Sequence, residues 1–355
     1  MVSYDIALYT RNHYQQGLFR EFPEIVSMAP RLKRDRNGKP TEDAYVVIGL
    51  REQRHLHRAF QLQAIGPDGQ PIEDLMVDFV LEIEGSIRAD RPIDEKTLLG
   101  HASPLAASNR MRPCPGGYEI CHESDPGGTL GGVAMVNGAW GYILSCAHVL
   151  TGPDSFAVGD GIHQPVKSGS SNHIASLTRW VSLVYSRYAQ NLVDVALAEV
   201  DDPWDSNVST EVEGIGSPIA VADPVQSQQV RLHCQRSGLV TGEVVDTDVT
   251  VCPEYERKGI LLETGFVHVF RVAKRNQLGH PQAVTKGGDS GATVWDSASE
   301  TALGIHFASS NLSAVFSYSY ACPIKLALYL LGTTTTGTDG DGNPVNFSQA
   351  TVTLF

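Results

Sequence analysis

A long succession of short strand-like runs constrains this chain more than any other feature of its sequence. Between about residues 111 and 332, apolar runs alternate with glycine-containing turns: TLGGVAMV, AWGYILSCAHVL, VDVALAEV, QVRLHCQR, GLVTGEVV, GILLETGFVHVFRV, GATVWD and ALGIHFAS. Many short strands separated by turns, over roughly two hundred residues, are typical of an all-β sandwich or a pair of barrels. The run PIKLALYLLG (323–332) has helical apolar spacing and ends at a glycine. We therefore expect a mainly β fold closed by a C-terminal helix.

The first hundred residues have a different texture. AYVVIGL (44–50) is a short apolar run, and MVDFVLEIEG (76–85) alternates as a half-buried strand does. The segment 95–117 is irregular and rich in Pro, Gly and Ser, so we place a boundary there. The resulting domain prediction is an N-terminal α+β accessory or regulatory region (1–108), a main domain (109–332) and a polar tail (333–355).

Charge and composition exclude several classes of partner. The net charge is −13, and the densest basic run, RLKRDR (31–36), is interrupted by an aspartate, as in a solvated loop. We therefore expect no nucleic-acid partner. The N-terminus lacks the apolar core of a signal peptide, and no apolar run could cross a bilayer. These features predict a cytoplasmic protein without a membrane partner.

The cysteines and histidines do not predict a metal centre. Six cysteines are scattered along the chain, at positions 114, 121, 146, 234, 252 and 322. Only the first two are close together, and no histidine pair completes a zinc-site spacing. His55, His57 and His101 also match no strong metal pattern. We expect reduced thiols, and neither a metal nor a cofactor.

The stretch KGGDSGATVW (286–295) contains a candidate nucleophile, Ser290. A serine hydroxyl is a poor nucleophile unless a base removes its proton, and that base works best when an acid fixes its tautomer. His148 follows an apolar strand-like run, and Asp194 lies within one, where an unpaired carboxylate would be costly. Singly these are weak signals. Together they run in the His–Asp–Ser order of chymotrypsin.

On these motifs, residues 128–332 resemble the trypsin/chymotrypsin-like serine peptidase superfamily. The matching motifs are SCAHVL around the histidine, VDVALAEV around the aspartate, GGDSGATVW around the serine, and GIHFASS (304–310). A second resemblance, carried by RPCPGGYEICH, GGTLGGVAMV and YILSCAHVL, is to intracellular bacterial and plant trypsin-like proteins that include the plant narrow-leaf protease. The resemblance implies a chymotrypsin-like double β-barrel, with the histidine and the aspartate on the first barrel and the serine on the second.

Site roles follow from the resemblance, residue by residue. Ser290 is the expected nucleophile, His148 the general base and then acid, and Asp194 the orienting carboxylate. Gly288 and Ser290 are expected to form the oxyanion hole through their backbone N–H groups. A glycine at position 288 agrees with this role, because it lacks a Cβ and can adopt an unusual turn.

Two departures from secreted relatives leave questions open. Val149 stands where those relatives carry a disulfide cysteine, and Cys146 lies two residues before His148 instead. Asp289 is present, but no cleavage-and-insertion motif precedes the barrel. Two questions stay open: which groups pair with the Asp289 carboxylate, and whether activity needs processing or a trigger.

The expected substrate pocket contains Val284, Thr285, His306 and Ser309. Val284 stands where trypsin-type members keep an aspartate, which argues against cleavage after basic residues. Thr285 and His306 resemble the threonine and histidine with which bacterial glutamyl endopeptidases hold an acidic side chain. Ser309 would leave the pocket mouth open. Two preferences therefore remain, an acidic residue or a small apolar one.

These expectations combine into a serine endopeptidase that hydrolyses protein or peptide substrates through an acyl-enzyme. We expect the N-terminal region to bind a regulatory partner or to form a homo-oligomer. Some bacterial relatives are associated with defence modules, which makes bacterial defence a candidate context. Two alternatives stay open: a catalytically silent trypsin-like scaffold that binds peptides, and an esterase that uses the same triad.

Overall fold

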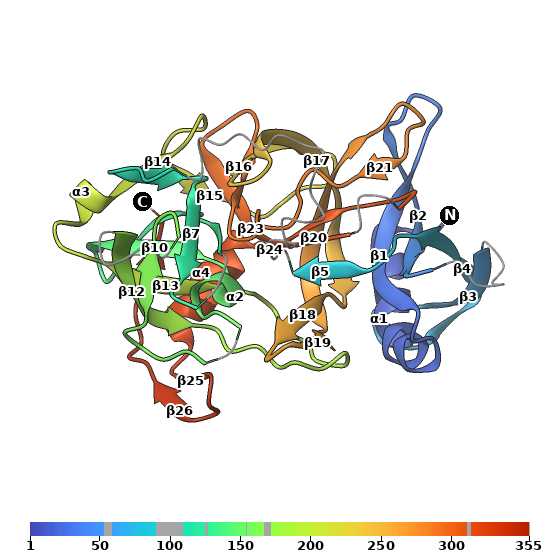
Figure 1. Ribbon diagram of the computed structural model, residues 1–355. Coiled ribbons are helices and arrows are strands. Elements are labelled where there is room, and N and C mark those ends of the chain that lie inside the picture. Colours follow the sequence, from blue (N-terminus) through green and yellow to red (C-terminus); the bar gives the residue numbers. More distant parts are fainter. Residues whose placement is uncertain are drawn as a thin grey trace.

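The computed structural model describes residues 1–355 apart from 53–58, 90–108, 125–126, 154, 167–171, 311–313 and 355 (Figure 1). This part of the chain is mainly β. Its helices are α1 (Tyr4–Glu21), α2 (Ala147–Leu150), α3 (Trp204–Asn207) and α4 (Ile324–Thr333). None of these helices combines the length with the apolar character that a membrane-spanning helix needs.

The first half of the main domain forms an eight-stranded sheet. Its order is β27-β9-β10-β13-β12-β11-β7-β8. The bounds are β7 (Glu119–His122), β8 (Gly128–Thr129), β9 (Gly132–Val136), β10 (Ala139–Ser145), β11 (Gly161–His163), β12 (His173–Trp180), β13 (Ala196–Val200) and β27 (Val352–Thr353). β27 pairs with β9, so the end of the polar tail adds a strand to this sheet.

Six strands of the second half pair in a closed ring. They are β16 (Gln229–Cys234), β17 (Gly238–Val251), β20 (Phe266–Arg275), β24 (Ser319–Pro323), β23 (Thr301–Ser310) and β22 (Thr293–Asp296). Each pairs antiparallel with the next, and β22 returns to β16. A ring of pairings without a free edge is a barrel.

Both halves share one hydrophobic core. It contains Leu144 and Leu197 of the first sheet together with Phe266 and Phe307 of the barrel, all almost fully buried. The prediction of a mainly β fold with a C-terminal helix is confirmed. The helix predicted over 323–332 is α4.

Shorter elements connect and extend these sheets. They are β6 (Cys114–Gly116), β14 (Val208–Val212), β15 (Ala220–Val221), β18 (Glu254–Arg257), β19 (Ile260–Glu263), β21 (Pro281–Gln282), β25 (Thr336–Thr338) and β26 (Pro344–Asn346). β6 and β14 pair in parallel, and β25 and β26 form a hairpin.

The N-terminal region is an α+β unit whose strands join the barrel's own sheet. After α1 come β1 (Ile25–Arg34), β2 (Pro40–Leu50), β3 (Ala59–Ile65), β4 (Pro71–Ile83) and β5 (Ile87–Ala89). β1 pairs antiparallel with β17, so the sheet is continuous from one unit into the other. The domain boundary at residues 108 and 109 stays a prediction, and residues 90–108 lie outside the described residues.

A buried ionic network holds β1 to the barrel. The Arg31 guanidinium donates to both oxygens of Asp246, over 2.9 and 2.8 Å, and to Glu82 over 2.9 Å. Tyr318 also donates to Glu82, over 2.6 Å. Burial raises the pKa of the Asp246 carboxyl, but the Arg31 guanidinium outweighs this effect, so that the pKa lies below its ordinary value. This charge is therefore buried as an ion and compensated by its partners.

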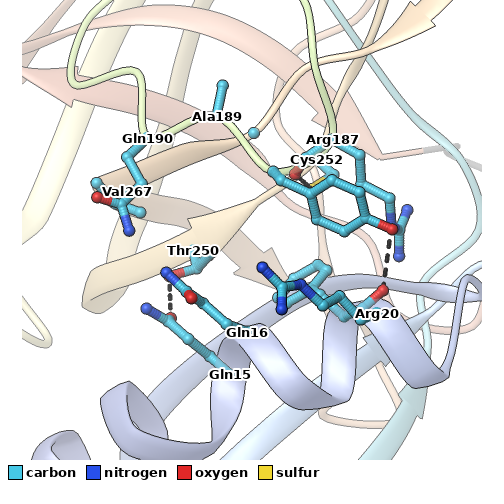
Figure 2. Close-up of a pocket in the computed structure, with 12 residues that line it drawn as sticks. Gln15, Gln16, Arg20, Arg187, Ala189, Gln190, Thr250, Cys252 and Val267 are labelled. Carbon is cyan, nitrogen blue, oxygen red and sulfur yellow. Dashed lines mark hydrogen bonds between the residues drawn. The ribbon is translucent and has the colours of Figure 1, made fainter.

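A cleft lies between helix α1 and the barrel strands β17 and β20 (Figure 2). Gln15 accepts a hydrogen bond from the Thr250 hydroxyl over 2.7 Å. Arg187 donates to the carbonyl of Ile25 over 2.5 Å. Arg187 also pairs with Glu263 over 2.9 Å. None of the candidate catalytic residues lines this cleft, and its polar groups hold the N-terminal region in place.

The buried network predicts a large difference between two positions on β1. Arg31→Leu removes the hydrogen-bonded cation of two buried carboxylates, with Arg271 left 3.7 Å from Asp246, and should lower the free energy of unfolding by about 3–5 kcal/mol. Lys33→Leu is the matched control, because its ammonium is 43% exposed beside Asp43 and Asp78. This control should cost at most about 1 kcal/mol. Chemical denaturation measures both, and equal losses would contradict the prediction.

Candidate active site

Two loops that carry predicted site residues meet at one carbonyl oxygen. Cys146, two residues before His148, donates its thiol hydrogen to the His306 carbonyl over 3.1 Å. The amide of Gly291, which follows Ser290, donates to the same oxygen over 2.8 Å. The end of β10 and the turn before β22 are thereby joined at β23. The predicted histidine and serine come from different sheets and lie at the same seam.

His148 and Asp194 are directly hydrogen-bonded. The Nδ1 atom of His148 lies 2.5 Å from Oδ2 of Asp194, and the amide of His148 donates to Oδ1 over 3.1 Å. The carboxylate is fully buried and the imidazole is 3% exposed. An ionised carboxylate only accepts, so Nδ1 carries a hydrogen, and in the neutral tautomer with this hydrogen Nε2 is the acceptor. This is the tautomer that a general base requires.

Tyr255 of β18 is a third partner of the carboxylate. Its hydroxyl donates to Oδ2 of Asp194 over 2.7 Å, and its ring meets the His148 ring edge-on at 5.5 Å between centroids. Burial by itself would raise the pKa of Asp194. The interactions with His148 and Tyr255 have the larger combined effect, and they lower this pKa below its ordinary value. Tyr255 was not predicted. It lies 61 residues from Asp194 in the chain, and no motif marks it.

The Ser290 hydroxyl is directed toward β23. It donates to the carbonyl of Phe307 over 3.1 Å, and the residue has no exposed surface. Nε2 of His148 has no hydrogen-bond partner among the described residues. The structure therefore places the serine at the seam with the histidine and the aspartate, but its hydroxyl is bonded to Phe307 and makes no hydrogen bond to the base.

The turn around Ser290 requires its glycines. Gly288 has φ +96° and Gly291 has φ +97°, backbone conformations that favour glycine. A Cβ on Gly291 would lie 2.1 Å from Oγ of Ser145 and 2.2 Å from the carbonyl of Thr129. The Gly288 carbonyl accepts from the Thr129 hydroxyl over 3.1 Å. The oxyanion role predicted for the Gly288 amide stays a prediction.

Asp289 is satisfied by the turn between β16 and β17, so no inserted N-terminus is needed to balance it. Its Oδ1 accepts from the amides of Arg236 and Ser237, over 2.9 and 3.0 Å. Its Oδ2 accepts from the amide of Lys286 over 2.9 Å and from the Ser237 hydroxyl. The carboxylate thus has four donors within the folded chain. The sequence carried no signal for Ser237.

The four predicted pocket residues lie on the strands and the turn beside the candidate nucleophile, and all four are buried. The Thr285 hydroxyl lies 2.7 Å from that of Ser309 and 2.5 Å from that of Ser319. Ser319 also accepts from the amide of Val284 over 3.1 Å. Three hydroxyl groups therefore gather here, and Ser319 had not been predicted.

His306 lies deeper on the same strand. Its Nδ1 donates to the carbonyl of Tyr320 over 2.9 Å, and the ring is fully buried. Its backbone belongs to the ladder with β24. The imidazole is therefore hydrogen-bonded within the sheet.

A cluster of potential metal ligands coincides with the candidate triad. Atoms of Cys146, His148 and Asp194 lie within 4.8 Å of one another. Their hydrogen bonds link His148 to Asp194, Asp194 to Tyr255, and Cys146 to the His306 carbonyl. These bonds account for the cluster without an ion. The histidines at positions 55, 57 and 101 lie outside the described residues.

Comparison with protein-family models and with curated proteins gives no match. Among solved structures, the chain is similar to a glutamic acid-specific serine protease described as using a histidine triad in substrate binding, at 19% identity and a TM-score of 0.42. That match covers 60% of this chain and 95% of the other. Thermobifida fusca protease A (13%, TM-score 0.40) and Cellulomonas bogoriensis chymotrypsin (13%, TM-score 0.40) each match over 60% of this chain and 93% of their own.

The buried carboxylate predicts a pH-dependent role for the Tyr255 hydroxyl. Because the pKa of Asp194 is lowered in the folded chain, its ionised form stabilises the fold above the ordinary pKa, and this contribution is lost as the pH falls through the lowered value. Tyr255→Phe should therefore cost about 1.5–3 kcal/mol at neutral pH. The cost should shrink as the pH falls through the lowered pKa of Asp194, which lies below the ordinary aspartate value of about 3.9.

Unfolding by denaturant across this pH range measures the cost. Tyr188→Phe, at a tyrosine that is 59% exposed, is the control and should change little at any pH. A Tyr255→Phe cost that stays constant from pH 7 down to the acid unfolding of the protein would contradict the assignment of the hydroxyl to the carboxylate.

Proposed function

We propose that this protein is a serine endopeptidase that uses His148, Asp194 and Ser290 as its triad. The observation that carries the proposal is the hydrogen bond of 2.5 Å between a buried imidazole and a buried carboxylate, with Nε2 left unpartnered at the seam where Ser290 lies. Burying a carboxylate costs free energy that hydrogen-bond donors must offset, and ionisable groups buried in this way cluster at functional sites. Acyl transfer uses this arrangement directly.

The reaction would begin with a rotation of the Ser290 side chain from the Phe307 carbonyl toward His148. Nε2 then takes the hydroxyl proton while Oγ attacks the substrate carbonyl carbon, and the new oxyanion accepts hydrogen bonds from the amides of Gly288 and Ser290. The intermediate collapses to an acyl-enzyme as the leaving amine takes the proton from His148. Water, deprotonated by the same histidine, then releases the acid.

The surroundings of Asp289 support activity without proteolytic processing. In this chain the carboxylate that shapes the oxyanion turn already has the amides of Arg236, Ser237 and Lys286 as donors. A new N-terminus is therefore not required to balance its charge. We propose that the turn between β16 and β17 does this instead.

The location and the partners follow as proposals from the same features. All six cysteines are among the described residues, and all are buried and outside any disulfide. Reduced cysteines support a reducing compartment such as the cytoplasm. Protein or peptide substrates remain the proposed partners, and the N-terminal region the proposed site of regulation or oligomerisation. A role in bacterial defence remains a candidate context.

A silent peptide-binding scaffold is the second candidate, and one observation favours it. Ser290 is fully buried, and its hydroxyl is bonded to Phe307 while the His148 Nε2 atom has no partner among the described residues. A protein with this arrangement at rest could bind a peptide without cleaving it. In that case Ser290→Ala would leave peptide binding unchanged, and no hydrolysis would be seen for either form.

Labelling by a fluorophosphonate tests the catalytic proposal. The wild-type protein should form a covalent adduct on Ser290, and Ser290→Ala should form none. His148→Ala should slow labelling by about a thousandfold or more, because the base is lost. Ser155→Ala, at an exposed serine, is the control and should label as the wild type does. A folded wild-type protein without an adduct on Ser290 would favour the silent scaffold.

The hydroxyl cluster predicts the substrate preference. Hydroxyl groups donate to carboxylates, so the hydroxyls of Thr285, Ser309 and Ser319 support an acidic or polar residue before the cleaved bond. In a random peptide library, Thr285→Val should reduce cleavage after acidic residues about tenfold relative to cleavage after small apolar ones. Thr285→Ser should retain the preference. A wild-type preference for apolar residues would refute this assignment of the pocket.

A further inference from the structure

The three-residue strand β5 leaves the other N-terminal strands and lies within the barrel's sheet. Figure 1 shows it as a cyan arrow that runs from the blue N-terminal strands toward the strands of the barrel. It pairs antiparallel with β23, with Ala89 opposite Ala308, Arg88 opposite Ser309 and Ile87 opposite Ser310. On its other side it pairs with β18 at Glu254. β5 is thus an inner strand, paired on both edges.

The edge of β23 that pairs with β5 is the edge that holds the candidate nucleophile. A strand has two edges, and β24 runs along one of them from Gly304 to Ser309. The other edge therefore carries β22, then the turn with Ser290, and then β5. The Gly291 amide bonds to the His306 carbonyl, and the Ser290 hydroxyl bonds to that of Phe307. The next residue along, Ala308, pairs with Ala89.

The register also sets the direction of β5. Ile87, the first residue of β5, pairs with Ser310, and Ala89, the last, pairs with Ala308. The chain therefore runs toward Ser290, and Ala89 is the residue of β5 closest along β23 to the Phe307 carbonyl. An extended peptide in this position would point its following peptide bond at the nucleophile.

Extended peptides bind to proteins by adding a strand to a sheet edge through main-chain hydrogen bonds. The edge of β23 beside Ser290 is where a peptide substrate would add such a strand, and β5 occupies it. On the basis of the proposed endopeptidase function, we propose that β5 is an internal occupant of the substrate-strand position, and that peptide hydrolysis requires β5 to leave it. The N-terminal region then regulates the site by supplying this strand.

The contacts of β5 and of the residues before it fit an occupant that is held but removable. Ile87 and Ala89 are buried, whereas the Arg88 side chain is 57% exposed and its Nε lies 3.4 Å from Glu254. Just before the strand, the carboxylate of Glu84 accepts hydrogen bonds from the hydroxyls of Ser27 and Ser310, each over 2.6 Å. The strand itself has only three residues and few ladder bonds, so its local opening costs less than that of a long inner strand.

The surroundings of Ser290 agree with an occupied site. The residue has no exposed surface, so a substrate cannot reach its hydroxyl in this arrangement. β18, the strand on the far side of β5, also carries Tyr255, which donates to Asp194. The position of β5 is therefore bordered on both sides by strands that contact the candidate triad.

A reversible covalent lock tests the proposal. Directly opposite residues of an antiparallel pair have Cα atoms about 4.5–5.5 Å apart, within the range of a disulfide. The double variant Ala89→Cys, Ala308→Cys, oxidised with glutathione disulfide, should pin β5 to β23. Intact mass and peptide mapping confirm the cross-link, and the same protein after reduction is its control.

Hydrolysis of a quenched-fluorescent peptide pool should fall about tenfold or more in the oxidised form and return on reduction, because the lock lowers the fraction of molecules with a free strand position. A fully cross-linked protein that hydrolyses the pool as fast as its reduced form would overturn the proposal.

A release variant tests the same proposal from the other side. Ile87→Ser weakens the buried anchor of β5 and should raise peptide hydrolysis severalfold. The matched control is Ile260→Ser on the neighbouring strand β19, where the side chain is 61% exposed, and it should leave the rate unchanged. An unchanged rate in a folded Ile87→Ser protein would count against β5 as the occupant.

Failure of the proposed function gives a different result. In that case no form of the protein, whether reduced, oxidised or carrying Ile87→Ser, is labelled by a fluorophosphonate on Ser290. If the reduced form is labelled and hydrolyses peptides but the lock has no effect, the endopeptidase proposal stands and the β5 proposal falls.

Discussion

The fully buried carboxylate of Asp194 is the constraint on which the rest of the site depends. An ion without exposed surface must receive hydrogen bonds from all sides, and its donors come from α2 and from β18. The His148 imidazole is oriented by this charge, and the position of Tyr255 places β18 beside the seam between the sheets. β18 pairs with β5, and β5 pairs with β23. The strand that donates to Asp194 is therefore connected, through two strand pairings, to the strand that contacts Ser290.

The N-terminal region is joined to the barrel by buried charges as well as by strand pairing. Arg31 bridges Asp246 and Glu82, and Glu84 accepts from hydroxyls on β1 and β23. Buried ion pairs are poor sources of net stability, but they penalise every arrangement in which the partners separate. They therefore fix the register of the N-terminal strands against the barrel. That register is what brings the chain into the barrel's sheet at β5.

Part of this site could be predicted from the sequence, for a physical reason. An acid inside the apolar run around Asp194 must find a donor, and His148 supplies one. The glycines beside Ser290 likewise predicted a turn that other residues would strain, and both have positive φ. Tyr255, Ser237 and Ser319 could not be found in this way. Tyrosine and serine are common residues, no local pattern marks these three, and their partners lie far away in the chain.

The sequence by itself determined the strand-rich architecture, the closing helix and the choice of candidate site residues, because hydrophobic periodicity, glycine turns and a costly acid are local properties. Only the tertiary structure decided how Asp289 is satisfied, which hydroxyls gather beside Thr285, and where β5 lies. A three-residue segment such as Ile87–Ala89 has too few positions to show a period, and its place depends on the edges of β18 and β23, more than 160 residues further along the chain. Pairing at that separation is set by the packing of the whole fold, and the local sequence does not specify it.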